Sequence, residues 1–167
     1  ERVAARRLYA GRGFQEAVAA AAQLDADPAI VSPRLGVVQA DKGVPPYALS
    51  VVEGSADNVL ARATDAAEPR DWWAELAPRS PFGEPLSEKI AGTQGIVIAA
   101  LSEAYLAMVA DDLKALPICD AARLRIVTRA PLERVEPALR GRVMPYDDRL
   151  DGPDSTDRGT RGDFAAR

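Results

Sequence analysis

Hydrophobic and polar positions follow two alternating periodicities along the chain, one typical of helices and the other of short strands. Residues 14–24 are strong helix formers that stop before Asp27-Pro28, and this predicts a helix. Strands are predicted where β-branched or alternating residues form short runs, at 29–31, 36–38, 47–52 and 124–128. Further helices are predicted from helical spacing or from a leading proline, at 58–67, 71–76 and 132–136.

The clearest single unit lies at 95–105. Residues 95–101 are continuously apolar, as expected of a strand covered on both faces, and Ser102 then begins a helix that runs towards Pro117. Alternation of strands and helices predicts an α/β fold, with a mostly parallel sheet flanked by helices. We expect one domain with its core at 1–143, and a polar loop and terminal helix at 144–167 that belong to the same domain.

The amino-acid composition excludes several kinds of catalytic and metal-binding site. The chain has no histidine, which excludes Ser-His-Asp and Cys-His catalysis and histidine-ligated metals. Cys119 is the only cysteine, so no disulfide forms within the chain, and we expect a reducing cytoplasm. No apolar run is long enough to cross a membrane. No metal-ligand spacing or phosphate-binding glycine motif is found, so no metal or other cofactor is expected.

The net charge is −4, but arginines crowd both ends of the chain and the middle is acidic. Since arginine binds phosphate oxygens with two parallel hydrogen bonds, two basic ends that meet in the fold would form a groove for an anionic polymer. The alternative is that these arginines only cover exposed faces.

Ligands of open α/β sheets bind beyond the carboxyl ends of strands. Ser32 and Ser102 each follow an apolar run, and Ser102 either leaves backbone N–H groups for an anion or simply caps its helix. The stiff segment 41–47 offers Asp41, Lys42 and Tyr47, although Tyr47 alternatively packs against the sheet.

Near the end of the chain, two adjacent carboxylates stand beside a guanidinium, at Asp147, Asp148 and Arg149. This arrangement either activates water or binds a metal, or it is a solvated turn.

Several segments, in this order, resemble the YaaA-like proteins, the peroxide-stress DNA-binding family and its shorter bacterial relatives. They are Leu8–Gly11, Val31–Val38, Val44–Leu49, Trp72-Trp73 and Ile96–Tyr105. The resemblance implies an α/β protein that acts on double-stranded DNA, with an architecture distantly like uracil-DNA glycosylase. The family is linked to the protection of genomes from damage or, in some relatives, to nucleobase modification and defence against phage, which implies DNA that in some cases carries modified bases.

The chain also departs from this family. The family begins with a strand and a polar loop that nothing upstream of Glu1 supplies, so we expect either that the sequence is incomplete at this end or that the first strand is missing. Arg34-Leu35 stands where a Lys-Tyr pair is usual, and the role of that aromatic side chain is therefore unfilled.

The first functional hypothesis is a DNA N-glycosylase that excises a modified base. Such an enzyme stacks the extruded base, faces the sugar with a carboxylate and holds the neighbouring phosphates. The catalytic candidates are Asp41, Asp147, Asp148 and Ser32. The base-binding candidates are Tyr9, Tyr47, Ser102 and Tyr105. The phosphate-binding candidates are Arg12, Arg34, Lys42, Arg149 and Arg161.

The alternative is a non-catalytic DNA-binding stress protein of the YaaA type, whose arginine-rich ends contact phosphates. A third hypothesis is a domain that binds a small molecule and has an acidic exterior.

Overall fold

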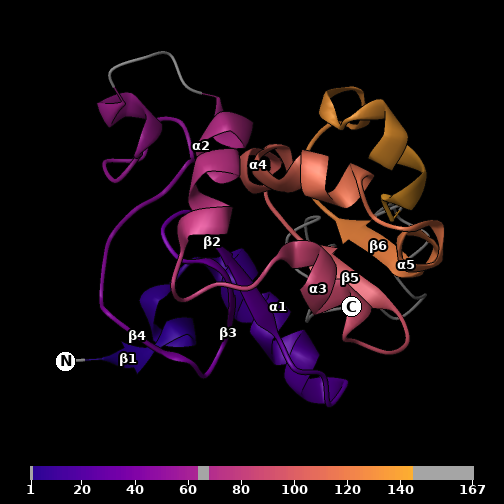
Figure 1. Cartoon of the computed structure of the whole chain (residues 1–167), viewed down its shortest axis with the longest axis horizontal. Helices are drawn as coiled ribbons and strands as arrows, with labels where there is room; N and C mark the ends of the chain where they lie inside the picture. Colours follow the sequence, from indigo (N-terminus) through magenta and orange to yellow (C-terminus); the bar gives the residue numbers. More distant parts are fainter. Residues whose placement is uncertain (1, 64–67, 145–167) are drawn as a thin grey trace, which may run out of the picture.

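A computed structural model describes residues 2–63 and 68–144, and its helices and short strands alternate along the chain (Figure 1), which confirms a mixed α/β composition. The α-helices are α1 (Arg12–Gln23), α2 (Pro69–Leu76), α3 (Leu86–Ala91), α4 (Glu103–Lys114) and α5 (Ile118–Arg123). The strands are β1 (Val3–Ala4), β2 (Ala29–Ser32), β3 (Gly36–Gln39), β4 (Gly43–Val44), β5 (Val97–Ala100) and β6 (Leu124–Val127). Short 3₁₀ helices lie at Ala5–Leu8, Leu60–Arg62, Ala77–Arg79, Leu132–Arg134 and Pro137–Arg142.

The strands pair two by two. β1 pairs with β4 and β2 with β3, both antiparallel, whereas β5 and β6 are parallel. A mostly parallel sheet is therefore not seen within residues 2–63 and 68–144. The reason at β2 and β3 is local: only residues 33–35 separate them, and a parallel crossover needs a dozen residues or more.

Three predicted elements differ from the structure. Residues 47–52 form no strand: Ser50 makes only an isolated bridge, with Asn58, and the preceding Pro45-Pro46 has no N–H groups for a ladder. Up to residue 63, the predicted helix at 58–67 is a single 3₁₀ turn, and the predicted helix after Pro131 is also 3₁₀. The predicted helices at 14–24 and 71–76 and the helix after Ser102 are confirmed as α1, α2 and α4.

The β2–β3 hairpin separates two hydrophobic cores. Neighbouring side chains of a strand point to opposite faces, so the Ile30–Val38 pair faces one core and the Val31–Val37 pair faces the other. The smaller core is formed near the start of the described chain, by Ala5, Ile30, Leu35, Val38, Ala40 and Val44. The hairpin is thus covered on both sides, as its apolar sequence requires.

The larger core surrounds α4. This helix buries side chains against α2, α3, β6 and the last 3₁₀ helix, among them Leu106, Met108, Val109 and Leu113. Trp73 of α2 is buried in the same core, and its indole N–H donates to Asp112 Oδ2 at 2.8 Å.

One predicted feature of β5 is wrong. The apolar run at 95–101 predicted a strand covered on both faces, yet the side chains of Ile96 and Ile98 are 66% and 53% exposed. Two strands form this sheet in the described residues, and the elements around α4 pack against only one of its faces. One face of β5 therefore reaches the surface.

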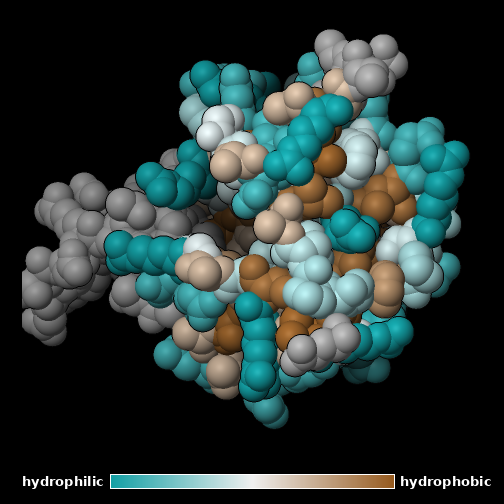
Figure 2. Space-filling view, turned by 90° about the vertical axis from the view of Figure 1, so that its left-hand side faces the viewer, coloured by the Kyte–Doolittle hydropathy of each residue, from teal (hydrophilic) through white to brown (hydrophobic). Residues whose placement is uncertain are grey.

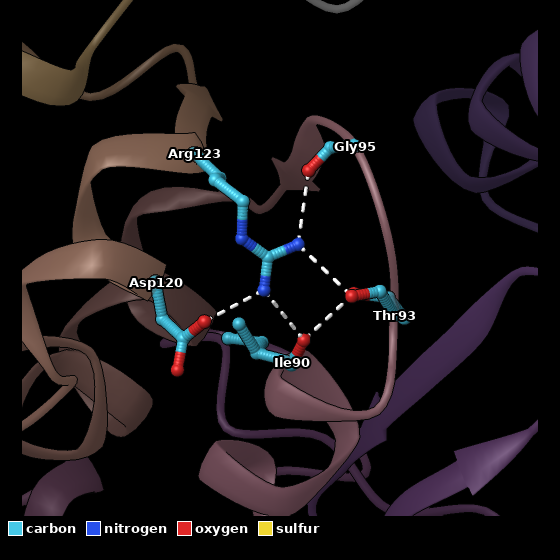
Figure 3. Close-up of polar contacts among 5 residues, drawn as sticks. All are labelled: Ile90, Thr93, Gly95, Asp120 and Arg123. Carbon is cyan, nitrogen blue, oxygen red and sulfur yellow. Dashed lines mark hydrogen bonds and ion pairs between the residues drawn. The ribbon is translucent and has the colours of Figure 1, made fainter.

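Arg123 fixes the link between α3 and β5 (Figure 3). Its guanidinium donates to the carbonyl oxygens of Ile90, Thr93 and Gly95 at 2.9–3.0 Å, and it pairs with Asp120 at 2.7 Å. The carbonyls at a helix C-terminus lack partners within the helix, so a cation there satisfies them. Arg123, the last residue of α5, therefore ties the segment between α3 and β5 to α5.

Across residues 2–63 and 68–144, none of the helices combines the length and the apolar character that crossing a membrane would require.

Candidate nucleic-acid interface

The turn between β2 and β3 carries Ser32 and Arg34 and is held from outside. The indole N–H of Trp72 donates to the Pro33 carbonyl oxygen at 2.8 Å, and Ser80 Oγ donates to the Leu35 carbonyl oxygen at 2.5 Å. A Cβ atom on Gly83 would lie 2.5 Å from that same Leu35 oxygen, so only glycine allows this close approach. The turn is thus fixed by contacts with α2 and with the loop that carries Ser80 and Gly83.

Ser32 is fully buried at the end of β2. Its Oγ accepts hydrogen bonds from the backbone N–H groups of Leu35, at 3.0 Å, and Arg34, at 3.3 Å. The same oxygen is hydrogen-bonded to the Tyr47 hydroxyl. Ser32 therefore joins the turn to the loop that follows β4.

Three of the predicted site residues meet at this point. Pro45-Pro46 ends the pairing of β4 and leads the chain back over β2, where the Tyr47 hydroxyl is hydrogen-bonded to both Ser32 and Tyr9. Tyr105, near the start of α4, lies close enough to these hydroxyls for its charge, when ionised, to raise the pKa of Tyr9. We call Tyr9, Ser32, Tyr47 and Tyr105 the tyrosine cluster.

One arrangement of protons satisfies all the hydrogen bonds of the serine. A serine hydroxyl has one hydrogen and two acceptor lone pairs, and two backbone N–H groups already point at Ser32 Oγ. The Ser32 hydrogen is therefore available to Tyr47, and Tyr47 can donate its own hydrogen to Tyr9. This order leaves the Tyr9 hydroxyl hydrogen for a further acceptor.

Tyr9 and Tyr105 keep their protons at neutral pH. Burial raises the pKa of Tyr9 well above the usual tyrosine range, and the neighbouring Tyr47 adds to the shift. Burial also raises the pKa of Tyr105, although its hydrogen bond with Ser50 opposes the change. At neutral pH Tyr9 is consequently an uncharged donor, suited to a carbonyl or phosphate oxygen of a ligand.

Arg34 covers one face of Tyr47. Its guanidinium carbon lies 5.7 Å from the centre of that ring, a cation–π distance, while the rest of the side chain is exposed. Tyr47 therefore supports Tyr9 and Arg34 and has one ring face already occupied.

A second feature adjoins the cluster through Tyr9. An open hollow of about 410 Å³ lies between the 3₁₀ helix at Ala5–Leu8 and the first two turns of α1. We call it the arginine hollow; its lining is Arg6, Arg7, Tyr9, Ala10, Phe14, Gln15 and Val18.

The aromatic wall of the arginine hollow is built by two contacts. The rings of Tyr9 and Phe14 lie 5.1 Å apart between centres at a tilt of 43°, and Gln15 Nε2 donates to the Tyr9 carbonyl oxygen at 2.8 Å. Arg6 and Arg7 are exposed beside this wall. The hollow thus combines an apolar aromatic surface with two cations.

The surface on this side of the molecule is mixed. Figure 2 shows the face at the left of Figure 1, where β1 and β4 lie. Hydrophilic residues project over it, and apolar residues reach the surface between them in small groups. Charged side chains and apolar contacts are therefore available next to one another on this face.

The structure places other predicted site residues apart from the tyrosine cluster. Asp41 is exposed and forms an ion pair with Arg6, between Oδ1 and Nε at 3.1 Å, which puts its carboxylate at the rim of the arginine hollow. Lys42 Nζ donates to the Phe82 carbonyl oxygen at 2.5 Å, and Arg12 pairs with Glu16 at 3.7 Å along α1.

Ser102 is exposed at the N-cap of α4, where its carbonyl accepts from the Leu106 N–H and its side chain makes no capping bond. Four other candidates lie outside the described residues, as does the predicted helix near Asp163: Asp147, Asp148, Arg149 and Arg161.

Sequence reasoning did not assign a role to Phe14, Gln15 or Ser50. The sequence indicated Phe14 and Gln15 only as part of a helix. In the structure Tyr9 contacts both of them, which their spacing along the sequence does not predict. The sequence showed Arg6 and Arg7 as part of a basic N-terminal segment. Their short distance from Tyr9 along the sequence was the one feature that could have indicated a shared site.

Within residues 2–63 and 68–144 no three side chains of the metal-binding types come together. Comparison with protein-family models, curated protein sequences and solved structures finds no match to this chain. The similarity to YaaA-like proteins therefore remains a prediction from the sequence.

Proposed function

We propose that this protein binds DNA at the surface formed by the tyrosine cluster and the arginine hollow. The observation that carries the proposal is the position of Tyr9, whose hydroxyl belongs to the tyrosine cluster and whose ring lines a hollow with two arginines. Nucleic acids present aromatic bases next to anionic phosphates, and aromatic rings beside arginines are the side chains that bind this combination.

Charge supports a local surface for DNA in a protein of negative net charge. Arg7 is exposed, and no ion pair to it is seen among residues 2–63 and 68–144, whereas Arg6 is partly neutralised by Asp41. Arg34 adds a third cation over Tyr47. DNA binding of this kind depends on the patch and not on the charge of the whole molecule.

Excision of a modified base is the second candidate function, favoured by the position of Asp41. Its carboxylate is held by Arg6 at the rim of the arginine hollow, where it could face the sugar of a nucleotide bound there. A carboxylate in that place stabilises the positive charge that develops on the sugar and orients water. The uracil-DNA-glycosylase-like architecture is part of this proposal, and the parallel β5–β6 pair supports it.

The compartment that we propose is the cytoplasm, since the only cysteine, Cys119, is free and exposed.

The first experiment measures binding of a labelled DNA duplex by fluorescence anisotropy at roughly 50 mM and 200 mM salt, a range over which phosphate contacts weaken steeply. Arg34→Ala should weaken binding about tenfold. Arg125→Ala is the matched control, because in the part of the chain that the structure describes that guanidinium bonds to the backbone oxygens of Ala122 and Leu124. Absence of DNA binding, or equal losses in both variants, would remove the proposal.

Base excision is tested on genomic DNAs that carry different base modifications, by assaying for abasic sites. Asp41→Asn should abolish release of the base while DNA binding is retained. Release at the wild-type rate by Asp41→Asn would take Asp41 out of the catalytic role.

A further inference from the structure

The arginine hollow differs in size from a second concave region of the described residues. That region, about 40 Å³ between α4 and the segment 130–136, holds little more than a water molecule. At about 410 Å³ the arginine hollow falls within the roughly 300–1,000 Å³ typical of small-molecule sites. Its size therefore admits one ligand of nucleotide dimensions.

The lining of the hollow separates two kinds of surface. Tyr9, Phe14 and Val18 give it an apolar wall, and the Tyr9–Phe14 contact holds the two rings in a fixed mutual orientation. Arg6 and Arg7 stand beside that wall and are exposed. A ligand that fits both surfaces has an aromatic ring and, a few ångströms from it, an anionic group.

Charge around the hollow favours an anion with the charge of one phosphate. Arg6 and Arg7 contribute two positive charges, and Asp41, paired with Arg6, contributes one negative charge. The sum near the rim is 2 − 1 = +1. Arg7 is thus free to bind a phosphodiester or phosphomonoester while Arg6 stays shared with Asp41.

We infer that the arginine hollow seats a single unstacked nucleotide, with its base against the Tyr9–Phe14 wall and its phosphate on Arg7. This inference rests on the proposed function and makes it more specific: the preferred DNA has an unpaired nucleotide, because a base inside a duplex cannot reach a wall of aromatic side chains. The same chemistry is present in a free nucleoside monophosphate, and the experiment separates the two sources.

The experiment measures anisotropy of labelled DNA with the full chain. The probes are a perfect duplex, a duplex with one bulged thymidine, and a duplex with one bulged abasic site. The bulged thymidine should bind roughly tenfold more tightly than the bulged abasic site, since base stacking is the contact that only the first can make. Free thymidine monophosphate is titrated separately, with intrinsic tyrosine and tryptophan fluorescence as the readout.

Two variants assign the contacts. Phe14→Leu keeps an apolar side chain on α1 but removes the ring, so it should reduce the preference for thymidine over the abasic site to less than about twofold. Arg7→Ala should weaken all three DNA probes alike and lower the slope of log affinity against log salt by about one. Arg125→Ala should change neither quantity.

Circular dichroism of each variant shows whether the fold is retained. If Phe14→Leu does not fold, Gln15→Ala provides a second change at the aromatic wall, because it removes the hydrogen bond to the Tyr9 carbonyl oxygen.

The outcomes are distinct. Equal binding of the thymidine and abasic bulges, or a preference that survives both Phe14→Leu and Gln15→Ala, overturns the inference and leaves DNA binding in place. Binding of thymidine monophosphate without binding of any DNA overturns the proposed function and keeps the hollow as a site for free nucleotides. Absence of binding to every probe overturns both.

Discussion

On one side of the β2–β3 hairpin, α4 buries long apolar side chains against α2, α3 and β6. On the other side fewer residues are buried, and hydroxyl groups, arginines and backbone carbonyls from distant segments make many of the contacts. Apolar burial stabilises in proportion to area and needs no exact geometry, whereas hydrogen-bonded groups hold particular atoms in particular places. The first region therefore supplies stability, and the second supplies a defined arrangement of polar side chains.

The same comparison explains why the candidate site lies where it does. Ser32, at the end of β2, is hydrogen-bonded to Tyr47, and both Tyr47 and Tyr9 pack against the smaller core. A fully apolar interior would offer no donors to a ligand. The larger core nonetheless supports the site, because Trp72 of α2 holds the hairpin turn at Pro33.

The largest effect is expected from a change in the larger core. Leu113 is 2% exposed, and Leu113→Ala should lower the free energy of unfolding by about 2–5 kcal/mol through lost burial and a remaining cavity. Urea unfolding followed by circular dichroism measures this loss. DNA binding of the protein that remains folded should be unchanged, and a loss below about 1 kcal/mol would contradict the division between the two regions.

A smaller loss of stability, joined to a functional loss, is expected at the smaller core. Ser32→Ala leaves the backbone N–H of Leu35 without its acceptor in a buried turn, which should cost about 1–3 kcal/mol. It also removes the partner of Tyr47, so DNA binding should weaken in the folded protein. Ser55→Ala is the matched control: Ser55 Oγ also accepts a backbone N–H, that of Asp57, but in an exposed turn. Equal losses of stability in the two variants would show that burial of Ser32 does not increase the cost of losing its hydrogen bond.

The smallest expected effect is a pH dependence of the free energy of unfolding, which arises from Tyr9 beside the smaller core and not from the larger core. Because the pKa of Tyr9 is raised in the folded protein, the folded state binds this proton more tightly than the unfolded state does. Its contribution to stability is complete below the ordinary tyrosine pKa of 10.0 and is lost as pH rises above that value. Unfolding in urea between about pH 8 and pH 11 should show this decline, and Tyr9→Phe should reduce it. An identical decline in Tyr9→Phe would assign the effect to other groups, Tyr105 among them.

Local sequence predicted the elements that depend on local properties. The alanine-rich run produced α1, Ser102 preceded α4, and the β-branched runs produced β2, β3 and β6. The prediction failed at 47–52, where alternation suggested a strand and Pro45-Pro46 prevented one, and at β5, where apolar character did not ensure cover on both faces. A hydrophobic pattern indicates which side chains are suited to burial, but it does not indicate whether another element packs against them.

The sequence by itself determined the kinds of chemistry open to this protein: it has no histidine, one cysteine, arginines towards its ends and tyrosines as possible ring surfaces. Only the tertiary structure decided which of these side chains meet. Tyr9 and Tyr47, which are hydrogen-bonded, are 38 residues apart in the sequence. Trp72 and Pro33, which are also hydrogen-bonded, are 39 residues apart. Contacts at such separations depend on how the hairpin packs between two cores, and this packing is a property of the whole chain that no single segment encodes.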